Sequence, residues 1–509
     1  MSGPGADRHP DKVADYNLST IILINSVGDR AELKLGTIAE LNVFEDIYSN
    51  AVTGTAHIVD AYNIISNASL QGNERLAFKL STPGVSTDRI DTVDASVGTG
   101  YPFHIYALTD RRIVNETTMS YTLHFCSREL FRNVRTRVSK AYNGGLAETV
   151  IGILRDKNGL DTRKKIFYEE TRNQDKVVIP NLRPFDAVNM ISRKALSKNA
   201  KGAGYYFYET TKGFHFRSYE SMLAYKSQYA RDEMVTLVYI PKKIGTLGER
   251  MFLNQHNVDS YEFMQHFDTL AQQATGTYAN TVITHNIYDK SYNVKDYHYH
   301  NYFSQMFHAD QVGNASRRNA PISETPVDLD PKDNGIPGDK TVSDYPNSLI
   351  SLQPSTRFLH NEDTGVFGTS TDSEGITEAI RISQENQVEN STRIKVIMPG
   401  HSYIEAGDVV NFRLPSLEPN KGEKKGYQYD EFHSGRYVIA KLRHRLIRGE
   451  YKMVLELIKD SVYRKHSGLP NEYYSYNETP MNKSENIYKQ DEFKMGSQAS
   501  PGYPGNREY

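Results

Sequence analysis

Two histidines in the run Tyr297–His300 are the residues best placed for metal chemistry. Residues two apart in a β-strand lie on the same face, so His298 and His300 could bind one metal ion if this run is a strand. No cysteine and no clear third ligand stands near them in the sequence. We therefore favour an interface strand rich in tyrosine and histidine, predict no metal site, and keep the metal pair as the alternative.

A second candidate for metal binding is the acidic run 328–335 (DLDPKDNG), which loosely resembles a calcium loop. Asp328, Asp330 and Asp333 would supply carboxylates, followed by the Asn-Gly pair at 334–335. However, Lys332 stands where a calcium-binding loop has Asp or Asn, and the closing Glu is absent. An ordinary turn built from Asp and Asn is the favoured interpretation.

Carboxylate pairs and a single cysteine complete the set of potentially reactive residues. Glu45 with Asp46 and Glu169 with Glu170 are adjacent, and adjacent residues in a strand point apart, so neither pair forms an acid and base by spacing alone. Cys126 lies in a strand-like run and is expected to be a buried thiol rather than a nucleophile. Motifs of nucleotide binding, serine hydrolysis, zinc proteolysis and redox Cys pairs are absent. We predict no catalytic residues, no cofactor and no enzymatic activity.

The composition indicates a large, polar protein with many strands. The chain has 509 residues, enough for three or four domains, with a formal net charge of -2 that argues against nucleic-acid binding by the whole chain. Mean hydropathy is -0.60. The chain has 35 tyrosines and no tryptophan, a composition that favours strands and large subunit interfaces. No signal peptide or membrane-spanning run is visible, so we expect folding in a cytoplasm.

The pattern along the chain divides it into five parts. Residues 14–127 alternate apolar and polar residues between turn signals and are expected to form a barrel. Residues 128–234 mix helical and strand patterns and are expected to form an α/β domain. Within the latter we predict three helices and one hairpin with its tip at 212–213: Arg128–Lys140, Leu146–Lys157, Arg183–Ser197 with Pro184 in its first turn, and Gly202–Tyr219.

The second half of the chain contains another strand-rich part and two irregular ones. Residues 235–309 and 374–465 are expected to form a second barrel with associated strands, entered by a helix over Glu374–Asn390. Residues 310–373 are dominated by Pro, Gly, Asp, Asn and Ser and are expected to be an irregular insertion. Residues 466–509 show no periodicity and are expected to be an extended tail.

The clearest strand patterns lie in Ile394–Ser416 and Ser434–Asp460. Pro399 and Gly400 are expected to turn the chain, and Gly407 and Asp408 to make a tight turn with a positive φ that sets the register of the strand after it. The second segment is also basic, and we favour interface salt bridges over nucleic-acid contact for its side chains: Arg436, Lys441, Arg443, Arg445, Arg448 and Lys452.

Five segments, in order along the chain, resemble the baseplate hub proteins of contractile-tailed, T-even-type phages: Leu41–Ala61, Arg183–Ser197, Tyr278–Asp289, Pro399–Pro415 and Ser434–Asp460. The resemblance covers roughly residues 16 to 465. It carries thirteen residues as structural signature positions, none of them catalytic: Phe44, Glu45, Asp46, Gly54, Pro184, His285, Pro399, Gly400, Gly407, Asp408, Tyr437, His444 and Glu456.

The resemblance implies an α+β, predominantly β fold, in which an α/β module joins two antiparallel β-barrels like those of a tail tube. It implies a homotrimer in the virion baseplate, assembled in the host bacterial cytoplasm, that joins a three-fold central spike to the six-fold tail tube. Its partners would be the spike and a tube or tube-initiator protein, with tape measure and baseplate wedge proteins as further candidates. Neither a membrane nor a specific nucleic-acid sequence is implied. A tail-associated cell-wall hydrolase and a spike or hub subunit of a related secretion machine are the alternatives.

Overall fold

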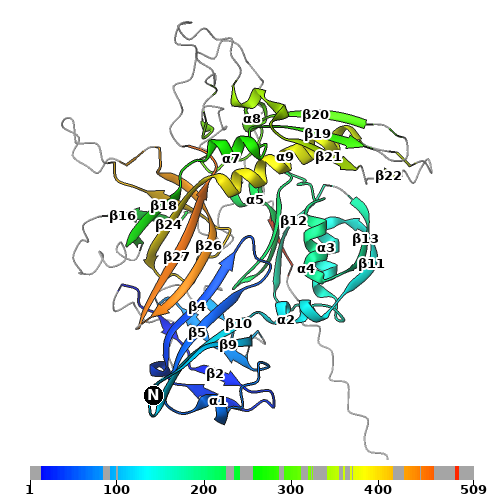
Figure 1. The fold of residues 1–509 in the computed structure, drawn as a ribbon. Coiled ribbons are helices and arrows are strands. Elements are labelled where there is room, and N and C mark those ends of the chain that lie inside the picture. The colour runs from blue at the N-terminus through cyan, green and yellow to red at the C-terminus, as the bar shows by residue number, and fades with distance from the viewer. Residues whose placement is uncertain are drawn as a thin grey trace, which may run out of the picture.

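The computed structural model describes most of the chain, and its parts are shown in Figure 1. The described residues are 13–83, 92–98, 101–172, 174–224, 234–240, 256–285, 290, 292–310, 319–322, 324, 341–354, 359–360, 367–368, 371–416, 429–430, 432–447, 449–462 and 488–491. Over these residues the fold is α+β and predominantly β, as predicted. None of the described helices is both long and apolar enough to cross a membrane.

A 14-stranded sheet runs through the first and last strand-rich parts of the chain. Its main path has the order β17-β16-β25-β26-β4-β5-β10-β9-β6-β2-β3. Strands β25 and β4 pair with successive stretches of β26, and β27 pairs with the opposite edge of β26, followed by β24 and β18. We call its N-terminal strands the first block: β2 (Ile21–Ile24), β3 (Arg30–Leu33), β4 (Ile38–Asp46), β5 (Thr53–Asp60), β6 (Arg75–Ala77), β9 (Phe103–Asn115) and β10 (Thr118–Cys126). The remaining strands form the second block: β16 (Thr236–Tyr239), β17 (Asn257–Val258), β18 (Ser260–Gln265), β24 (Thr392–Pro399), β25 (Val409–Arg413), β26 (Gly435–Ile447) and β27 (Glu450–Lys459).

The two blocks do not form the two closed barrels that we expected. No described sheet closes on itself. In the first block, the second edge of β4 pairs with β26 of the other block instead of with a strand of its own block. The blocks also share one hydrophobic core, which contains Val43 and Tyr121 from the first and Val396 and Leu455 from the second. A small sheet, β1 (Asn17–Leu18), β7 (Lys79–Ser81) and β8 (Thr92–Asp94), and the short helices η1 (Leu35–Thr37) and α1 (Ile64–Asn67) accompany the first block.

An α/β module with its own core follows the first block and lies beside the large sheet in Figure 1. Its sheets are β11-β13 and β14-β15-β12-β28. The elements are α2 (Arg128–Arg135), β11 (Val138–Gly145), α3 (Leu146–Arg155), β12 (Lys165–Glu169), β13 (Gln174–Leu182), α4 (Pro184–Ser192), β14 (Tyr205–Thr210), β15 (Gly213–Ser218), α5 (Tyr219–Ala224) and β28 (Tyr488–Asp491).

The predicted hairpin and three helices of this module are present, but the first helix was predicted too long, and the third, expected to reach Ser197, ends at Ser192. The hairpin β14–β15, helix α3 and the start of α4 at Pro184 are as expected. In contrast, α2 ends at Arg135, and buried Val138 begins a strand opposite Leu182. Residues 143–145 are the last residues of that strand.

An upper lobe, at the top of Figure 1, contains a three-stranded sheet of order β20-β19-β21. Its elements are α7 (Thr269–Ala274), β19 (Ala279–His285), β20 (Tyr292–His298), α8 (Tyr299–Phe303), η3 (Val342–Asp344), η4 (Pro346–Ser348), β21 (Ile350–Pro354), β22 (Leu359–His360), β23 (Phe367–Gly368) and α9 (Thr371–Asn390). Helix α9 confirms the predicted helix. The expected irregular insertion is not irregular throughout, because β21 pairs in parallel with β19. The tail contributes one described strand, β28, to the α/β module.

Candidate functional site

The pairing of β4 with β26 brings together signature residues from distant parts of the chain. Seven residue pairs form this antiparallel ladder, which we call the seam. Asp46 lies opposite Lys441, Glu45 opposite Leu442, and Phe44 opposite Arg443. Because successive residues of a strand alternate between faces, the seam presents one face of charged side chains and one buried face.

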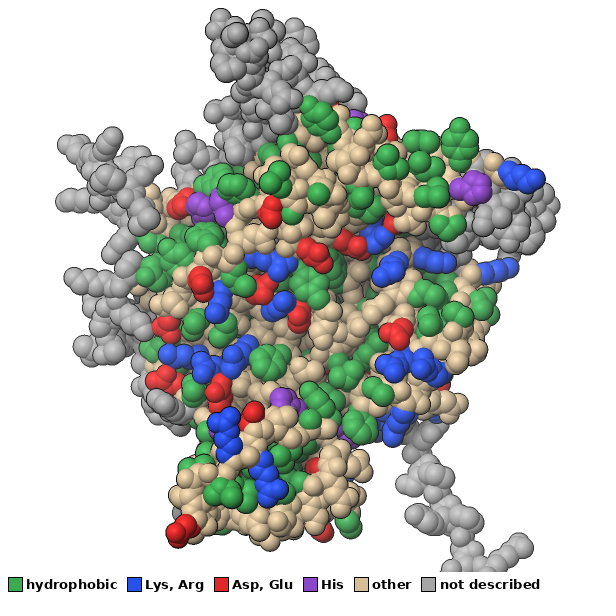
Figure 2. Space-filling model, in the orientation of Figure 1, with side chains coloured by type: hydrophobic (Ala, Val, Ile, Leu, Met, Phe, Trp, Pro, Cys, Tyr) green, Lys and Arg blue, Asp and Glu red, His purple; other side chains and the backbone are tan. Residues whose placement is uncertain are grey.

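The outer face of the seam carries ion pairs that cross from one block to the other. Glu40 Oε1 accepts hydrogen bonds from Arg443 Nη2 at 2.7 Å and Arg445 Nε at 2.9 Å. Arg443 Nε also donates to Asn42 Oδ1 at 2.9 Å. Figure 2 shows acidic and basic side chains interspersed over this part of the sheet. These partly exposed pairs fix the register of the two strands more than they add stability.

The charged face continues from the seam into the second block. Lys441 Nζ lies 4.0 Å from Asp46 Oδ2 and 3.6 Å from Glu456 Oε2. Arg393 Nη1 lies 3.0 Å from Glu456 Oε1. Lys441, Arg443 and Arg445 therefore form salt bridges within this chain, and the interface salt bridges expected for the basic segment stay a prediction. Lys452 likewise pairs with Asp259 and Glu450, Arg436 donates to the Leu223 carbonyl, and Arg448 lies outside the described residues.

On the buried face, the Glu45 carboxylate joins three parts of the molecule. The Glu45 side chain is 1% exposed. Its Oε1 accepts a hydrogen bond from the Thr211 N–H at 2.7 Å, at the tip of the β14–β15 hairpin of the α/β module. Its Oε2 accepts a hydrogen bond from the Ala406 N–H at 3.0 Å, in the loop between β24 and β25 of the second block. One side chain of the first block thus holds both other parts by charge-assisted hydrogen bonds.

Gly407, next to Ala406, makes the tight turn predicted from the sequence. Its φ is +87°, and a Cβ atom there would lie 2.1 Å from the hydroxyl oxygen of Tyr208 on β14. The Gly407 carbonyl accepts a hydrogen bond from Arg217 Nη2 at 2.6 Å, and its N–H donates to the Ile439 carbonyl at 2.8 Å. The turn is therefore clamped between the α/β module and β26 just before β25, whose Val409 pairs with Val438.

A buried polar cluster surrounds this turn. Glu405 Oε2 accepts a hydrogen bond from the Thr210 hydroxyl at 2.7 Å and lies 3.5 Å from His215 Nε2. Lys212 Nζ donates to the Tyr403 carbonyl at 2.9 Å. Burial alone would raise the pKa of Glu405, but His215, the Lys212 charge and the Thr210 hydroxyl together hold this pKa well below its ordinary value. The hairpin tip and the loop are thus joined by charge as well as by packing.

The pKa of Asp408 shifts in the opposite direction to that of Glu405, which makes the contact between the loop and the hairpin tip sensitive to pH. Burial, followed by the nearby Glu405 charge, raises the pKa of Asp408 to about 7. The folded protein therefore binds a proton between pH 4 and 7 that the unfolded chain, with an ordinary Asp pKa near 3.9, releases. The contribution of this group to stability falls as pH rises through that window.

We expect Asp408→Asn to become more stable relative to the wild type as pH rises. Asn cannot ionise but keeps an oxygen that can accept the Glu405 N–H bond, 3.2 Å in the wild type. The difference in the free energy of unfolding between the two proteins should change by about 2–3 kcal/mol between pH 5 and 8 in favour of the variant. Urea unfolding at several pH values measures it. A difference that is the same at pH 5 and pH 8 would contradict the raised pKa.

His444 and Gly400 lie on the buried side of the second block. His444 Nδ1 hydrogen-bonds the Tyr451 hydroxyl at 2.7 Å, and His444 Nε2 lies 3.9 Å from Glu45 Oε1. A Cβ atom on Gly400 would lie 2.3 Å from the ring of Tyr451, so only glycine fits beside that ring. Pro399, the last residue of β24, lies opposite Lys452. These residues shape the inner packing of the second block.

The remaining signature residues serve local packing. A Cβ atom on Gly54 of β5 would lie 2.2 Å from the ring of Phe125. Tyr437 of β26 is fully buried and donates its hydroxyl to the His433 carbonyl at 2.6 Å. Pro184 begins α4, and His285 is an exposed residue at the end of β19. The structure places these outside the seam and the turn at Gly407.

The histidine pair does not share a strand face. His298 ends β20, and His300 lies in α8. His298 Nδ1 hydrogen-bonds the Ser343 carbonyl at 2.8 Å, while His300 hydrogen-bonds the Ser343 hydroxyl and the Ile322 carbonyl. Over the described residues, no group of three or more His, Cys, Asp or Glu side chains could hold a metal ion. The acidic run 328–335 lies outside the described residues.

Glu169, Glu170 and Cys126 have structural surroundings. Glu169 is buried and accepts a hydrogen bond from the Ser218 N–H at 2.7 Å, whereas Glu170 forms an exposed pair with Lys198. The two carboxylates thus have separate partners, as their adjacent positions predicted. Cys126 is buried, and burial raises the pKa of its thiol to about 12. This confirms the prediction of a buried core thiol.

Sequence reasoning missed the half-buried Lys164 and its partner Glu209, and Glu209 makes a second tie between the module and the first block. Lys164 Nζ lies 3.1 Å from Glu129 Oε2 and also pairs with Glu209. Glu209 Oε2 accepts the Val52 N–H bond at 2.9 Å. Arg217, which clamps Gly407, was missed as well. The alternating pattern of the β14–β15 hairpin does not reveal that its polar residues are buried.

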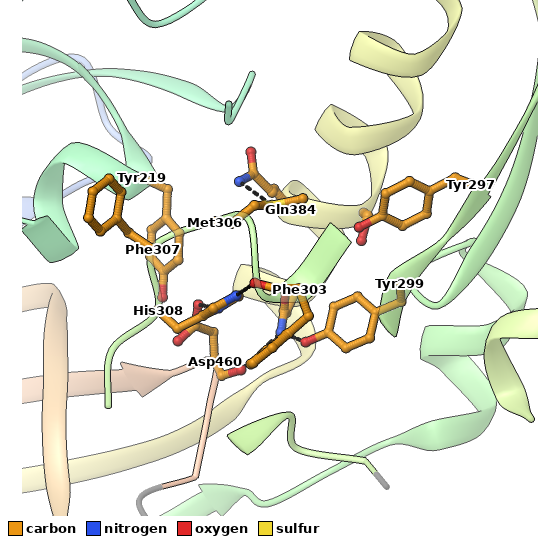
Figure 3. Close-up of a pocket in the computed structure, with 11 residues that line it drawn as sticks. Tyr219, Tyr297, Tyr299, Phe303, Met306, Phe307, His308, Gln384 and Asp460 are labelled. Carbon is orange, nitrogen blue, oxygen red and sulfur yellow. Dashed lines mark hydrogen bonds and ion pairs between the residues drawn. The ribbon is translucent and has the colours of Figure 1, made fainter. Parts of the chain in front are cut away.

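One small pocket lies where the upper lobe, α5 and α9 meet the end of β27 (Figure 3). His308 Nδ1 lies 2.9 Å from Asp460 Oδ2, and the His308 ring stacks on Phe303. Gln387 Nε2 donates to the Asp460 carbonyl at 3.0 Å. The free space of about 10 Å³ suits a single water molecule rather than a substrate. We interpret this pocket as part of the packing between the lobe and the sheet.

Comparison with known proteins gives structural likenesses only. No protein-family model and no curated protein matches the chain. The fold is similar to a tail protein from Neisseria meningitidis MC58, with 9% identity over 88% of this chain and 97% of that one and a TM-score of 0.46. It is also similar to the 43 kDa tail protein of prophage MuSo2 from Shewanella oneidensis, with 9% identity, 87% and 99% coverage and a TM-score of 0.45.

A third similar structure is an E. coli component of the type VI secretion system that itself exhibits structural similarity to T4 bacteriophage tail proteins. It has 10% identity, covers 84% of this chain and 75% of that chain, and gives a TM-score of 0.36. The structures to which this chain is similar thus include phage tail proteins and a secretion-system component.

Proposed function

We propose that this chain is a structural hub subunit of a phage baseplate, which acts as a homotrimer between a three-fold spike and a six-fold tail tube. The observation that carries the proposal is the seam, where the resembling segments Leu41–Ala61 and Ser434–Asp460 meet over seven residue pairs. A subunit that converts one symmetry into another must hold two similar faces at a fixed angle. One continuous sheet with one shared core is a rigid way to do so.

In this proposal, each subunit presents its two blocks as two tube-facing units, so three subunits present six. The α/β module then braces the two blocks through Glu45, Gly407 and the cluster around Glu405. The signature residues at the seam maintain geometry and take no part in chemistry. The proposed domains remain 14–127, 128–234, 235–309 with 374–465, 310–373 and 466–509.

We expect light scattering to give three times the chain mass of 57.8 kDa, either for the isolated protein or after co-expression with the spike of the same tail. A Tyr-rich, polar chain is suited to large wet interfaces of the kind a trimer buries. A monomer under both conditions would contradict the hub proposal. A turbidity assay on peptidoglycan tests the hydrolase alternative, and we expect no clearing.

A further inference from the structure

The edge of β12 that faces away from β15 is covered by β28, a strand from the last part of the chain. On one side β12 pairs in parallel with β15, with Lys165 opposite Gly213 and Tyr168 opposite Phe216. On the other side it pairs antiparallel with β28 over four residue pairs, from Ile166 opposite Asp491 to Glu169 opposite Tyr488. Among the described strands, β28 pairs with no other. The tail therefore meets the module as an added edge strand.

The core of the module holds β12 firmly in place. Ile166 and Phe167 are buried, and the Phe167 ring stacks on His215 with 4.9 Å between centroids. The buried Glu169 carboxylate accepts hydrogen bonds from the Ser218 N–H and the Ser197 hydroxyl. Removal of β28 would leave the outer N–H and C=O groups of this fixed strand unpaired. A rigid strand with an unpaired edge is a ready acceptor for an extended segment.

The connection to β28 is long enough to reach another molecule. Twenty-five residues, 463–487, separate Val462 from Tyr488. Fully extended, a segment of this length spans about 80 Å. The four backbone pairs with β12 are the same whether the strand comes from its own chain or from a neighbour, so an exchange loses no contact.

We propose that the edge of β12 is a docking site for residues 488–491 of a neighbouring copy, so that in the assembled hub each subunit adds its C-terminal strand to the module of the next. This inference rests on the proposed homotrimer. A head-to-tail contact that uses two different surfaces of each subunit closes into a ring when three copies follow one another around an axis. The exchanged strands then tie the ring together.

Cysteines at an opposed pair of positions test the exchange. Tyr168 lies opposite Lys489 in the register. Opposed Cα atoms in antiparallel strands are about 4.5–5.5 Å apart, within the range that a disulfide spans. We would oxidise Tyr168→Cys/Lys489→Cys and run it on a non-reducing denaturing gel. Most of the protein should appear as covalently linked dimers and trimers. Linkage only within single chains, or no linkage, would overturn the proposal.

Two controls separate this inference from the hub proposal. The unmodified protein, whose single Cys126 is buried, should show no cross-links. Mixing separately made Tyr168→Cys and Lys489→Cys proteins should give a linked dimer, which only exchange between chains can produce. Light scattering before oxidation decides the rest: a trimer without interchain linkage would leave the hub proposal standing and remove the exchange, while a monomer would contradict both.

A truncated chain gives a second test that does not depend on the cysteine variants. A protein that ends at Ile487 keeps β12 and loses the strand that covers it. We expect its trimer to dissociate on dilution at a concentration at least tenfold higher than for the full chain. An unchanged dissociation concentration would overturn the exchange.

Discussion

Glu45→Ala should destabilise the protein by about 3–5 kcal/mol, the largest effect that we expect from a single polar side chain. The substitution leaves the N–H groups of Thr211 and Ala406 without an acceptor, and each buried N–H left unpaired costs about 1–3 kcal/mol. It also removes the carboxylate 3.9 Å from His444 Nε2. Urea unfolding followed by circular dichroism measures the loss.

Two companion variants sharpen this test. Glu45→Gln keeps an acceptor oxygen and should fall between the wild type and Glu45→Ala. Glu32→Ala removes an exposed carboxylate from β3 of the same block and should stay within about 0.5 kcal/mol of the wild type. If Glu45→Ala lost no more than Glu32→Ala, the carboxylate would not be the tie between the three parts of the molecule.

Gly407→Val should cost about 3–5 kcal/mol, because strain and a clash act together. A β-branched residue at a φ of +87° is strained by about 1–3 kcal/mol. The new Cβ atom would also meet the Tyr208 hydroxyl at 2.1 Å and Arg217 Nη2 at 3.0 Å, and overpacking of this kind adds about 1–3 kcal/mol. From the proposed hub function we further expect impaired assembly of tails. The midpoint of thermal unfolding and the yield of complete tails measure the two effects.

Gly449 offers a matched control for the strain. Its φ is +77°, and no atom of the described residues, apart from its chain neighbours, lies within 4 Å of the Cβ position, so Gly449→Val carries strain without the clash. Gly407→Ala combined with Tyr208→Phe should recover part of the stability lost in Gly407→Ala alone. Equal losses for Gly407→Val and Gly449→Val would show that the contact with Tyr208 adds nothing.

Local features of the fold could be predicted because each has a local signal. The alternation of Tyr437 to Leu446 predicts β26, and Gly407 with Asp408 predicts a turn with a positive φ. The pairing of β26 with β4 has no such signal, since Glu40 and Arg443 lie 403 residues apart and each could pair with many other charged residues. The expected barrels failed for the same reason. We had assumed that the edge strands of each block would pair with each other.

Two errors arose where one pattern fits two structures. Val134 and Val138 have helical spacing, yet Val134 is 58% exposed and Val138 belongs to a strand, so the spacing does not reflect a buried helical face. Tyr299 and Phe303 also have helical spacing and do form the buried face of α8, which takes His300 off the strand that we predicted. In both cases, the core against which the segment packs decides whether it forms a helix or a strand.

The distance of the seam along the chain has a consequence for synthesis. The first block leaves the ribosome with one edge of β4 unpaired, and its partner follows 403 residues later. At bacterial rates of about 5–20 residues per second, that edge waits roughly 20–80 s for β26. Unpaired edges are sites of aggregation, so the nascent chain requires protection during this interval. A chain that terminates before β26 never acquires the seam, so only chains that include β26 can hold both blocks in one sheet.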